Sequence, residues 1–540
     1  MASGCCAVRD DAGTGRGLRP ALGPGAPLAA GLPGRRRRTS CNETATGGKG
    51  PFGPGRAGHA VAYPEYGAPV PHHQSLMITR HLLLTTLLAS FATAQTWTLA
   101  TPAPFPNTLA RRQGGLAFHP TQGGLLMYGG LQSGPTLTLN ETWVFDGVTW
   151  TQLTPATTPP PRWGHKMVYD SRRNRIVAFG GRSPTTTVTA NDTWEWDGSD
   201  WQQIVTPTSP NARAFYGMAY DERRGVTVIY GTQGGSTALG GNQTWEFDGT
   251  TWSQAITPTT PPGLEAPAMA YDKGRGVVVM FGGFNGTPPS TDYRTTYEYD
   301  GVDWVLRPTA NAPITGYRAN MVYDDFRGRL VLYGGFGAGA AQQTTWEYDG
   351  NDWTTVATTG PAKSTEGYMA YLATTTQTVH FGGSGPTPAG TVNNETWTYS
   401  GATTAIAAPF GRGCATSAGV PSFTPSTLPQ FGTNYSLSLS GAPALAVGLV
   451  IHGLDNLQFA PGFYLPLDLT AVGIAGCSLQ VRPDLLIAEL VAGGFTHVLP
   501  IPNTPSFVGI GLFSQALVLD DQSPNGFGGL SNAIHGVLGS

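Results

Sequence analysis

A repeat of about 51 residues is the feature of this sequence that most restricts its fold. Glycines recur at steps of 51, 51, 51, 52 and 48 residues, at Gly129, Gly180, Gly231, Gly282, Gly334 and Gly382. A second glycine follows each of them except Gly231, which Thr232 follows. Repeats of this length are typical of solenoids and propellers, whose units bury their hydrophobic faces only against neighbouring units. The sequence therefore predicts a modular array.

Aromatic residues keep the same period. An upstream aromatic recurs at Phe118, Tyr169, Tyr220, Tyr271, Tyr323 and Tyr371. A downstream aromatic follows each glycine, at Trp143, Trp194, Trp245, Tyr297, Trp346 and Trp397. A last tryptophan comes seven residues later in the first five copies, at Trp150, Trp201, Trp252, Trp304 and Trp353. These positions predict a repeated structural core.

Each copy predicts four short strands, illustrated by the second. The first expected strand ends with residues 167–170, and the other three span residues 175–179, 192–196 and 200–205. The second is a continuous apolar run, which is typical of a strand buried on both faces. Asp197-Gly198 separates the last two strands, and this dipeptide favours a two-residue hairpin because type I′ turns need positive φ. The Asp-Gly pair recurs in other copies, at Asp146, Asp248, Asp300 and Asp349.

An apolar strand, a glycine doublet and two aromatics separated by six residues together resemble the kelch repeat. The segment Trp143-Val-Phe-Asp-Gly-Val-Thr-Trp150 shows the aromatic spacing. The resemblance covers residues 97–410 and is to secreted bacterial kelch proteins. It implies an all-β fold in which each repeat forms one blade of a six-bladed kelch-type β-propeller, with residues 95–410 as the propeller domain.

The sixth copy lacks its last tryptophan, because position 404 is Thr404. The segment Trp97-Thr-Leu-Ala-Thr-Pro102 matches Trp150-Thr-Gln-Leu-Thr-Pro155. We therefore predict that the N-terminal strand completes the sixth blade and closes the ring. In the alternative, residues 403–408 form the missing strand and the N-terminal strand is peripheral.

The N-terminal region predicts export. Met77-Ile-Thr-Arg80-His81 precedes the apolar run 82–94, which ends in Ala92-Thr93-Ala94. A basic segment, an apolar segment and an A-x-A site make a signal peptide, and the run is too short to span a bilayer. We expect residues 77–94 to be removed and Gln95 to be the mature N-terminus of a secreted, cell-surface or periplasmic protein. Residues 1–76 are then a mis-assigned or disordered extension; the alternative is a disordered tail with a buried segment at 82–94.

Residues 411–540 alternate apolar runs with Gly/Pro turns and predict a smaller β-sandwich or jelly-roll domain. The run Leu485–Val491 is too short to distinguish helix from strand. Cys414 and Cys477 are the only cysteines after the predicted cleavage site, so we expect them to form a disulfide; two free buried thiols are the alternative. The region loosely resembles C-terminal modules of secreted bacterial repeat proteins.

The net charge of −3 gives no electrostatic case for nucleic-acid binding. The turns within each blade place the longer loops at one end, which is the expected binding face. Residues near the start of the first strand of each blade are candidate ligand contacts for an extracellular glycan or protein: Arg111, Arg162, Trp163, His165, Arg213, Tyr216, Tyr317 and Arg318. Arginine and aromatic groups hold carboxylates and stack on planar or ring ligands. In the alternative, these residues line the channel and brace the loops.

The sequence predicts a non-catalytic binding or adhesion scaffold without a cofactor or metal. Galactose oxidase resembles this chain in its kelch repeats, but its chemistry needs a cysteine cross-linked to a tyrosine. No cysteine lies between residues 95 and 413. An unrecognised carbohydrate-active enzyme is the alternative function, with Glu141, Asp192, Glu265 and Glu366 as possible carboxylates. The Asp/Arg pairs after each first strand, such as Asp170 with Arg172 or Arg173, are expected to be surface ion pairs worth at most about 1 kcal/mol.

Overall fold

The computed structural model describes residues 95–540 except 101–109, 133–136, 184–188, 233–239, 287–290, 358, 363, 386–391, 402–403, 445, 457, 461–462, 471–473 and 540. The predicted signal peptide at 77–94 and the extension at 1–76 lie outside the described residues. The described chain is all-β, with two short 3-10 turns, η2 (Pro120–Gln122) and η6 (Pro505–Phe507). The all-β class is therefore confirmed.

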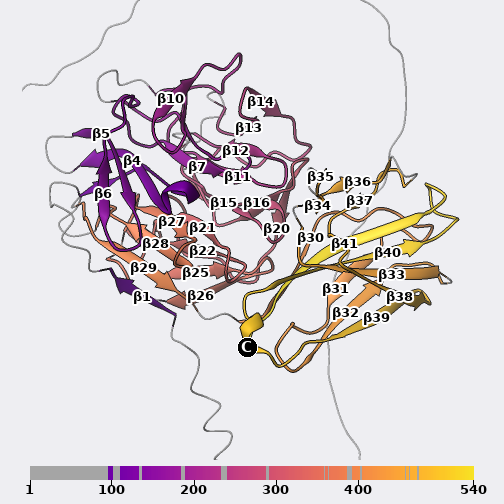
Figure 1. Cartoon of the computed structure of the whole chain (residues 1–540). Helices are drawn as coiled ribbons and strands as arrows, with labels where there is room; N and C mark the ends of the chain where they lie inside the picture. The colour runs from indigo at the N-terminus through magenta and orange to yellow at the C-terminus, as the bar shows by residue number, and fades with distance from the viewer. Residues whose placement is uncertain are drawn as a thin grey trace, which may run out of the picture. The chain divides into compact units, whose positions relative to one another are not determined.

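Residues 96–400 form six antiparallel sheets (Figure 1). Five of them are built from the strands of one repeat, and the sixth combines three strands of the last repeat with the N-terminal strand. We number these sheets as blades 1 to 6. Blade 1 contains β3 (Gly115–His119), β4 (Gly124–Gln132), β5 (Thr138–Phe145) and β6 (Trp150–Leu153), with β2 (Arg111–Arg112) also pairing with β4. Blade 2 contains β7 (Lys166–Asp170), β8 (Arg175–Phe179), β9 (Thr193–Trp196) and β10 (Trp201–Ile204). Blade 3 contains β11 (Gly217–Asp221), β12 (Val226–Tyr230), β13 (Thr244–Phe247) and β14 (Trp252–Ala255).

The second half of the ring repeats this arrangement. Blade 4 contains β15 (Ala268–Asp272), β16 (Val277–Phe281), β19 (Thr296–Tyr299) and β20 (Trp304–Arg307). Blade 5 contains β21 (Asn320–Asp324), β22 (Arg329–Tyr333), β25 (Thr345–Tyr348) and β26 (Trp353–Ala357). Blade 6 contains β27 (Tyr368–Leu372), β28 (Gln377–Phe381), β29 (Thr396–Ser400) and β1 (Thr96–Leu99). Two small ribbons extend the loops, β17 (Phe284–Asn285) with β18 (Thr291–Asp292) and β23 (Phe336–Gly337) with β24 (Ala340–Ala341).

The innermost strands contact one another in the cyclic order β3, β7, β11, β15, β21, β27 and back to β3. The second strand of each blade lies deepest in the packing, as its continuous apolar sequence predicts. Leu126, Val177, Val228 and Val331, for example, have no exposed surface. Each blade therefore buries its faces against two neighbours, which is the arrangement of a propeller.

The N-terminal strand closes the ring, so this prediction is confirmed. β1 pairs antiparallel with β29, with Trp97 opposite Tyr399, and Figure 1 shows the indigo β1 beside the orange β29. The alternative strand at residues 403–408 does not fill this place. Instead β30 (Ile406–Phe410) pairs with a strand of the C-terminal domain, so the chain has left the propeller before residue 410.

The last tryptophan of each blade links that blade to the preceding one. Its indole N–H donates to a threonine hydroxyl in the third strand of the neighbouring blade. The six bonds measure 2.8–3.0 Å and join Trp97 to Thr345, Trp150 to Thr396, Trp201 to Thr142, Trp252 to Thr193, Trp304 to Thr244 and Trp353 to Thr296. Because Trp97 takes the place expected of a final-strand tryptophan in blade 6, the series is continuous around the ring.

The arginines after the first strands differ from our expectation of surface ion pairs. Arg275 bonds both Asp272 and Glu298, and its side chain is only 1% exposed. Arg327 makes the equivalent bonds to Asp324 and Glu347 and is 2% exposed. The expectation was wrong for these blades because the third-strand glutamate reaches the same guanidinium and the neighbouring blade covers it. Removing one partner of a buried pair is far more costly than removing a surface charge.

The C-terminal domain is a sandwich of two sheets. One has the order β30, β41 (Gly528–Val537), β40 (Gly511–Leu519), β33 (Ala446–Gly453) and β38 (Leu485–Val491). The other has the order β31 (Ser422–Pro425), β32 (Asn434–Ser440) and β39 (Gly494–Pro500). Short ribbons pair β34 (Gln458–Ala460) with β35 (Phe463–Tyr464) and β36 (Leu467–Asp468) with β37 (Ser478–Leu479). Buried side chains from both sheets, including Phe423, Leu437, Val450 and Ile534, form the core.

The predicted Cys414–Cys477 disulfide is present, with a sequence separation of 63 residues. The run at 485–491, which the sequence left ambiguous, is strand β38.

Candidate functional site

A closed belt of backbone hydrogen bonds surrounds the channel axis where the chain enters the innermost strands. It joins Gln113, Gly164, Phe215, Ala266, Arg318 and Glu366, one residue from each repeat. The N–H of each residue donates to the carbonyl of the preceding one, and Gln113 N–H donates to Glu366, at 2.6–3.5 Å. We call these six residues the belt.

Every belt residue has a positive φ, between 49° and 71°. Only Gly164 is a glycine, and this left-handed conformation costs other L-residues roughly 1–2 kcal/mol. Strained backbone persists where surrounding structure holds it in place. Here the cyclic hydrogen bonds between blades hold it, so the belt fixes six residues, five of which carry side chains, around one opening.

Charged side chains connect four blades at this opening. Arg112 bonds Glu366 at 2.6 Å, and Arg318 bonds Glu366 at 2.6 Å and Glu265 at 3.1 Å. The side chains of Arg112 and Arg318 remain 28% and 34% exposed, whereas Glu366 is 3% exposed. Burial acts to lower the pKa of Arg318, but the charges of Glu366 and Glu265 offset this and raise it. The Arg318 guanidinium therefore stays charged, and it remains partly exposed at the opening.

Aromatic rings surround Arg318. Its guanidinium carbon lies 5.6 Å from the ring centroid of Phe215 and 5.4 Å from that of Tyr317. Trp163 packs edge-on against Phe215, with centroids 5.4 Å apart. Trp163 and Tyr317 are half-buried, and their rings contact other loop residues at Arg182 and Phe284. We define Trp163, Phe215, Tyr317 and Arg318 as the mouth cluster.

Three of the predicted ligand contacts, Trp163, Tyr317 and Arg318, thus come together at the mouth. The other five are enclosed by protein. Arg111 bonds Glu141, and Arg162 bonds Asp192 through two nitrogens at 2.7 and 2.8 Å. Arg213 donates to the carbonyl of Gly231 at 3.1 Å. All three arginines are at most 3% exposed. Their contacts favour the bracing role that the sequence left open as the alternative.

His165 and Tyr216 lie behind the belt. The His165 ring packs against Tyr128 with centroids 5.5 Å apart, and burial lowers its pKa to about 3. The Tyr216 hydroxyl donates to the carbonyl of Phe179, and burial raises its pKa. Neither side chain is more than 1% exposed, so ligand binding by this pair stays a prediction that their packing does not favour.

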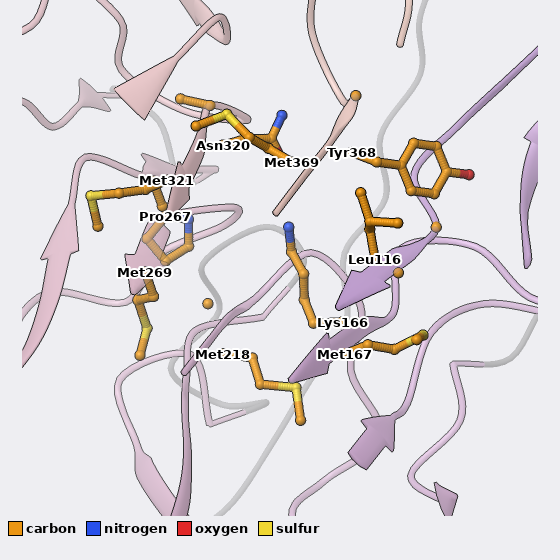
Figure 2. Close-up of a pocket in the computed structure, with 16 residues that line it drawn as sticks. Leu116, Lys166, Met167, Met218, Pro267, Met269, Asn320, Met321, Tyr368 and Met369 are labelled. Atoms are coloured by element: carbon orange, nitrogen blue, oxygen red, sulfur yellow. The ribbon is translucent and has the colours of Figure 1, made fainter. Parts of the chain in front are cut away.

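Below the belt, the inner strands enclose a cavity of about 80 Å³ (Figure 2). Five methionines and one leucine, three residues after each belt position, line its wall: Leu116, Met167, Met218, Met269, Met321 and Met369. Their side chains also pack between blades; adding a Cβ at Gly115, for example, would place it 2.4 Å from the Met167 sulfur. Figure 2 shows Lys166 extending among them, and burial lowers the pKa of its amine. The channel is thus a narrow, lined interior below the mouth.

The four carboxylates considered for glycoside cleavage are all paired with arginines. Glu141 bonds Arg111, Asp192 bonds Arg162, and Glu265 and Glu366 share Arg318. A glycosidase needs a carboxyl group with a raised pKa as its general acid. The pKa of Asp192 is instead lowered: burial acts to raise it, but the bonds from Arg162 outweigh that effect. These pairs suit structural bracing better than acid catalysis.

Among the residues that the structure describes, no group of three or more His, Cys, Asp or Glu side chains could hold a metal ion. In the same part of the chain, no helix is long and apolar enough to cross a membrane.

Sequence reasoning missed the belt, although a signal for it was present. Each belt residue lies five positions before the recurrent upstream aromatic, as Gln113 does before Phe118. The belt residues themselves differ in type, because the backbone and not the side chain makes the contact that recurs in each repeat. A search for repeated residue types therefore passed over them.

Comparison with known families supports the repeat assignment. Residues 115–307 match the family model described as the KLHDC2/KLHL20/DRC7 Kelch-repeats domain. The matched range runs from the start of β3 to the end of β20, which is four blades. No curated protein matches the chain. The family match and the repeated four-stranded sheets together fit a kelch-repeat β-propeller.

Proposed function

We propose that this chain is a non-catalytic binding scaffold whose ligand is a protein that docks at the mouth cluster. Kelch repeats are typical of protein-interaction scaffolds, and the family match gives this function its first support. The observation that carries the site is the convergence of Trp163, Tyr317 and Arg318, held by the belt around one opening. Half-exposed aromatic and arginine side chains are the residue types that dominate protein-binding surfaces.

The geometry of the mouth suits recognition more than chemistry. The belt joins all six blades, so the side chains it carries are pre-organised and lose little freedom on binding. The acidic groups nearby are neutralised by arginines within the protein. A partner that adds aromatic or carboxylate contacts to Arg318 would therefore meet a fixed surface.

A glycan is the second candidate ligand, because Trp163 and Tyr317 are partly exposed aromatic residues beside Arg318. Under either proposal the protein acts outside the cytoplasm, after removal of residues 77–94. Sequencing the N-terminus of the native protein tests export: Gln95 as the first residue supports it, and an intact Met1 contradicts it.

The experiment is a selection of binders from a displayed protein or peptide library, in parallel with a glycan array. Binders are then measured against Trp163→Ala and Arg318→Ala, with Phe326→Ala as the control. Phe326 is 39% exposed and lies in the turn between β21 and β22, at the other end of its blade. We expect each mouth variant to weaken binding by at least about tenfold, or 1.4 kcal/mol.

If Trp163→Ala and Arg318→Ala bind as tightly as the wild-type chain, the ligand does not bind at the mouth cluster. Release of sugar fragments from the array would contradict the non-catalytic assignment and favour a carbohydrate-active enzyme.

A further inference from the structure

One edge of the C-terminal sandwich is open. Strand β38 is the last strand of its sheet and pairs only with β33 among the residues that the structure describes. An edge strand presents a row of free N–H and C=O groups and so acts as a template for another strand. β38 has seven residues, which is long for an exposed edge.

The side chains of this edge are apolar. Leu486 is 55% exposed and Leu490 is 87% exposed, and Ala488 between them is also exposed. Val447 of β33 lies opposite Leu490 and is 44% exposed. Soluble proteins protect such edges with charges, prolines or bulges. The stripe 486–488–490 carries none of these devices.

The one charged residue of β38 lies on the other side of the strand. Glu489 accepts a hydrogen bond from His497 Nδ1 at 2.8 Å, and His497 Nε2 in turn lies 3.0 Å from His452 Nε2 within the sandwich. This bond holds the carboxylate away from the exposed stripe. The stripe therefore carries no charge, and its free edge has no partner strand within the described part of the chain.

The sequence of β38 is self-complementary in an antiparallel pairing. If two copies meet with Ala488 on the two-fold axis, Leu486 of each copy lies opposite Leu490 of the other. No ionisable side chain then faces its own copy, which is the arrangement that an isologous interface requires. A charged stripe would instead repel itself across the axis.

We propose that β38 is a homodimer interface in which two chains pair their β38 strands antiparallel about Ala488. The two five-stranded sheets then form one continuous sheet of ten strands. Main-chain hydrogen bonds supply the attraction, and the leucine stripe supplies apolar burial and register. This interface is independent of the ligand proposed for the mouth.

The test is the mass of the full-length chain in solution, measured by light scattering and by sedimentation over a concentration series. We expect the wild-type chain to have twice the mass of one chain. Ala488→Lys and Ala488→Glu should each be monomeric, because each variant places like charges together on the axis. Mixing the two variants should restore a dimer that contains one chain of each.

Val420→Lys is the matched control, since Val420 is 55% exposed in the same domain but lies outside the β-strands. This variant should remain dimeric, and circular dichroism should show all variants folded. A wild-type chain that is monomeric at every concentration overturns the proposal, whether the edge is bare or covered by another segment or protein. The proposal is also overturned if Ala488→Lys and Ala488→Glu each form a dimer by themselves, or if their mixture fails to form the mixed dimer.

Discussion

Replacing Trp97 by alanine tests the closure of the propeller. The Trp97 side chain is only 8% exposed, and its ring lies between Tyr333 and Tyr399, with centroids at 4.9 and 5.1 Å. Its N–H donates to the Thr345 hydroxyl at 2.8 Å. Removing a buried tryptophan costs about 3–5 kcal/mol through lost burial and the cavity that remains. We expect the free energy of unfolding of the propeller to fall by that amount.

Urea denaturation followed by tryptophan fluorescence measures this change. All 13 tryptophans lie between Trp97 and Trp397, so their fluorescence reports the propeller and not the C-terminal domain. Leu99→Ala is the control because Leu99 belongs to the same strand but is 42% exposed. It should cost less than about 1 kcal/mol. A loss below about 1 kcal/mol in Trp97→Ala itself would refute the claim that β1 holds the ring shut.

Three further changes test the packing described above. Glu298→Gln removes one buried charged partner of Arg275 and should destabilise the propeller by about 3–5 kcal/mol in urea denaturation. The control Glu222→Gln removes only the partly exposed pair with Lys273 and should cost at most about 1 kcal/mol. Equal costs would contradict the burial argument. Burial lowers the pKa of His165 and His380 to about 3, from 6.5 in the unfolded chain. Between these two pH values the unfolded state binds more protons than the folded state. The free energy of unfolding therefore falls as the pH decreases from about 6.5, by up to about 1.4 kcal/mol per pH unit for each histidine. His165→Phe should therefore flatten the pH dependence of the unfolding free energy, and an unchanged slope would show that His165 does not resist protonation. Replacing both Cys414 and Cys477 by alanine removes a cross-link that closes a 63-residue separation and should lower the stability of the C-terminal domain by roughly 4 kcal/mol on the chain-entropy model, seen as a lower midpoint in far-UV circular dichroism with the tryptophan transition unmoved.

The repeat architecture could be predicted from the sequence because it depends on residue types at fixed spacing. The last tryptophan of each blade must reach a threonine of the preceding blade. Neither the indole side chain nor the spacing between successive tryptophans along the chain can therefore vary much. The same reasoning placed β1 in blade 6, since Trp97 matches a final-strand tryptophan and only the sixth repeat lacks one. Glycine doublets and Asp-Gly turns were equally informative because their backbone angles exclude most other residues.

The candidate site was less accessible to this reasoning. Arg111 and Arg162 share one period, and Trp163 directly follows Arg162, yet both arginines are enclosed by protein and only Trp163 reaches the mouth. Spacing alone does not reveal on which side of the backbone a side chain lies, because Arg162 and Trp163 precede strand β7 and Arg111 lies in the two-residue strand β2. Burial of Arg275 was missed for a related reason: its second carboxylate, Glu298, comes from a strand 23 residues away.

Ring closure through β1 has a consequence for how the protein is made. β1 is the earliest strand of the described chain to leave the ribosome, but its partner β29 is synthesised about 300 residues later, as the Thr98–Thr398 contact shows. Contacts between such distant segments form slowly. Five blades can assemble in order during translation, while β1 stays unpaired until β29 has been synthesised. A rearranged chain that carries residues 95–100 directly after residue 401 would give every blade its strands in consecutive order, and we expect it to fold faster than the natural order.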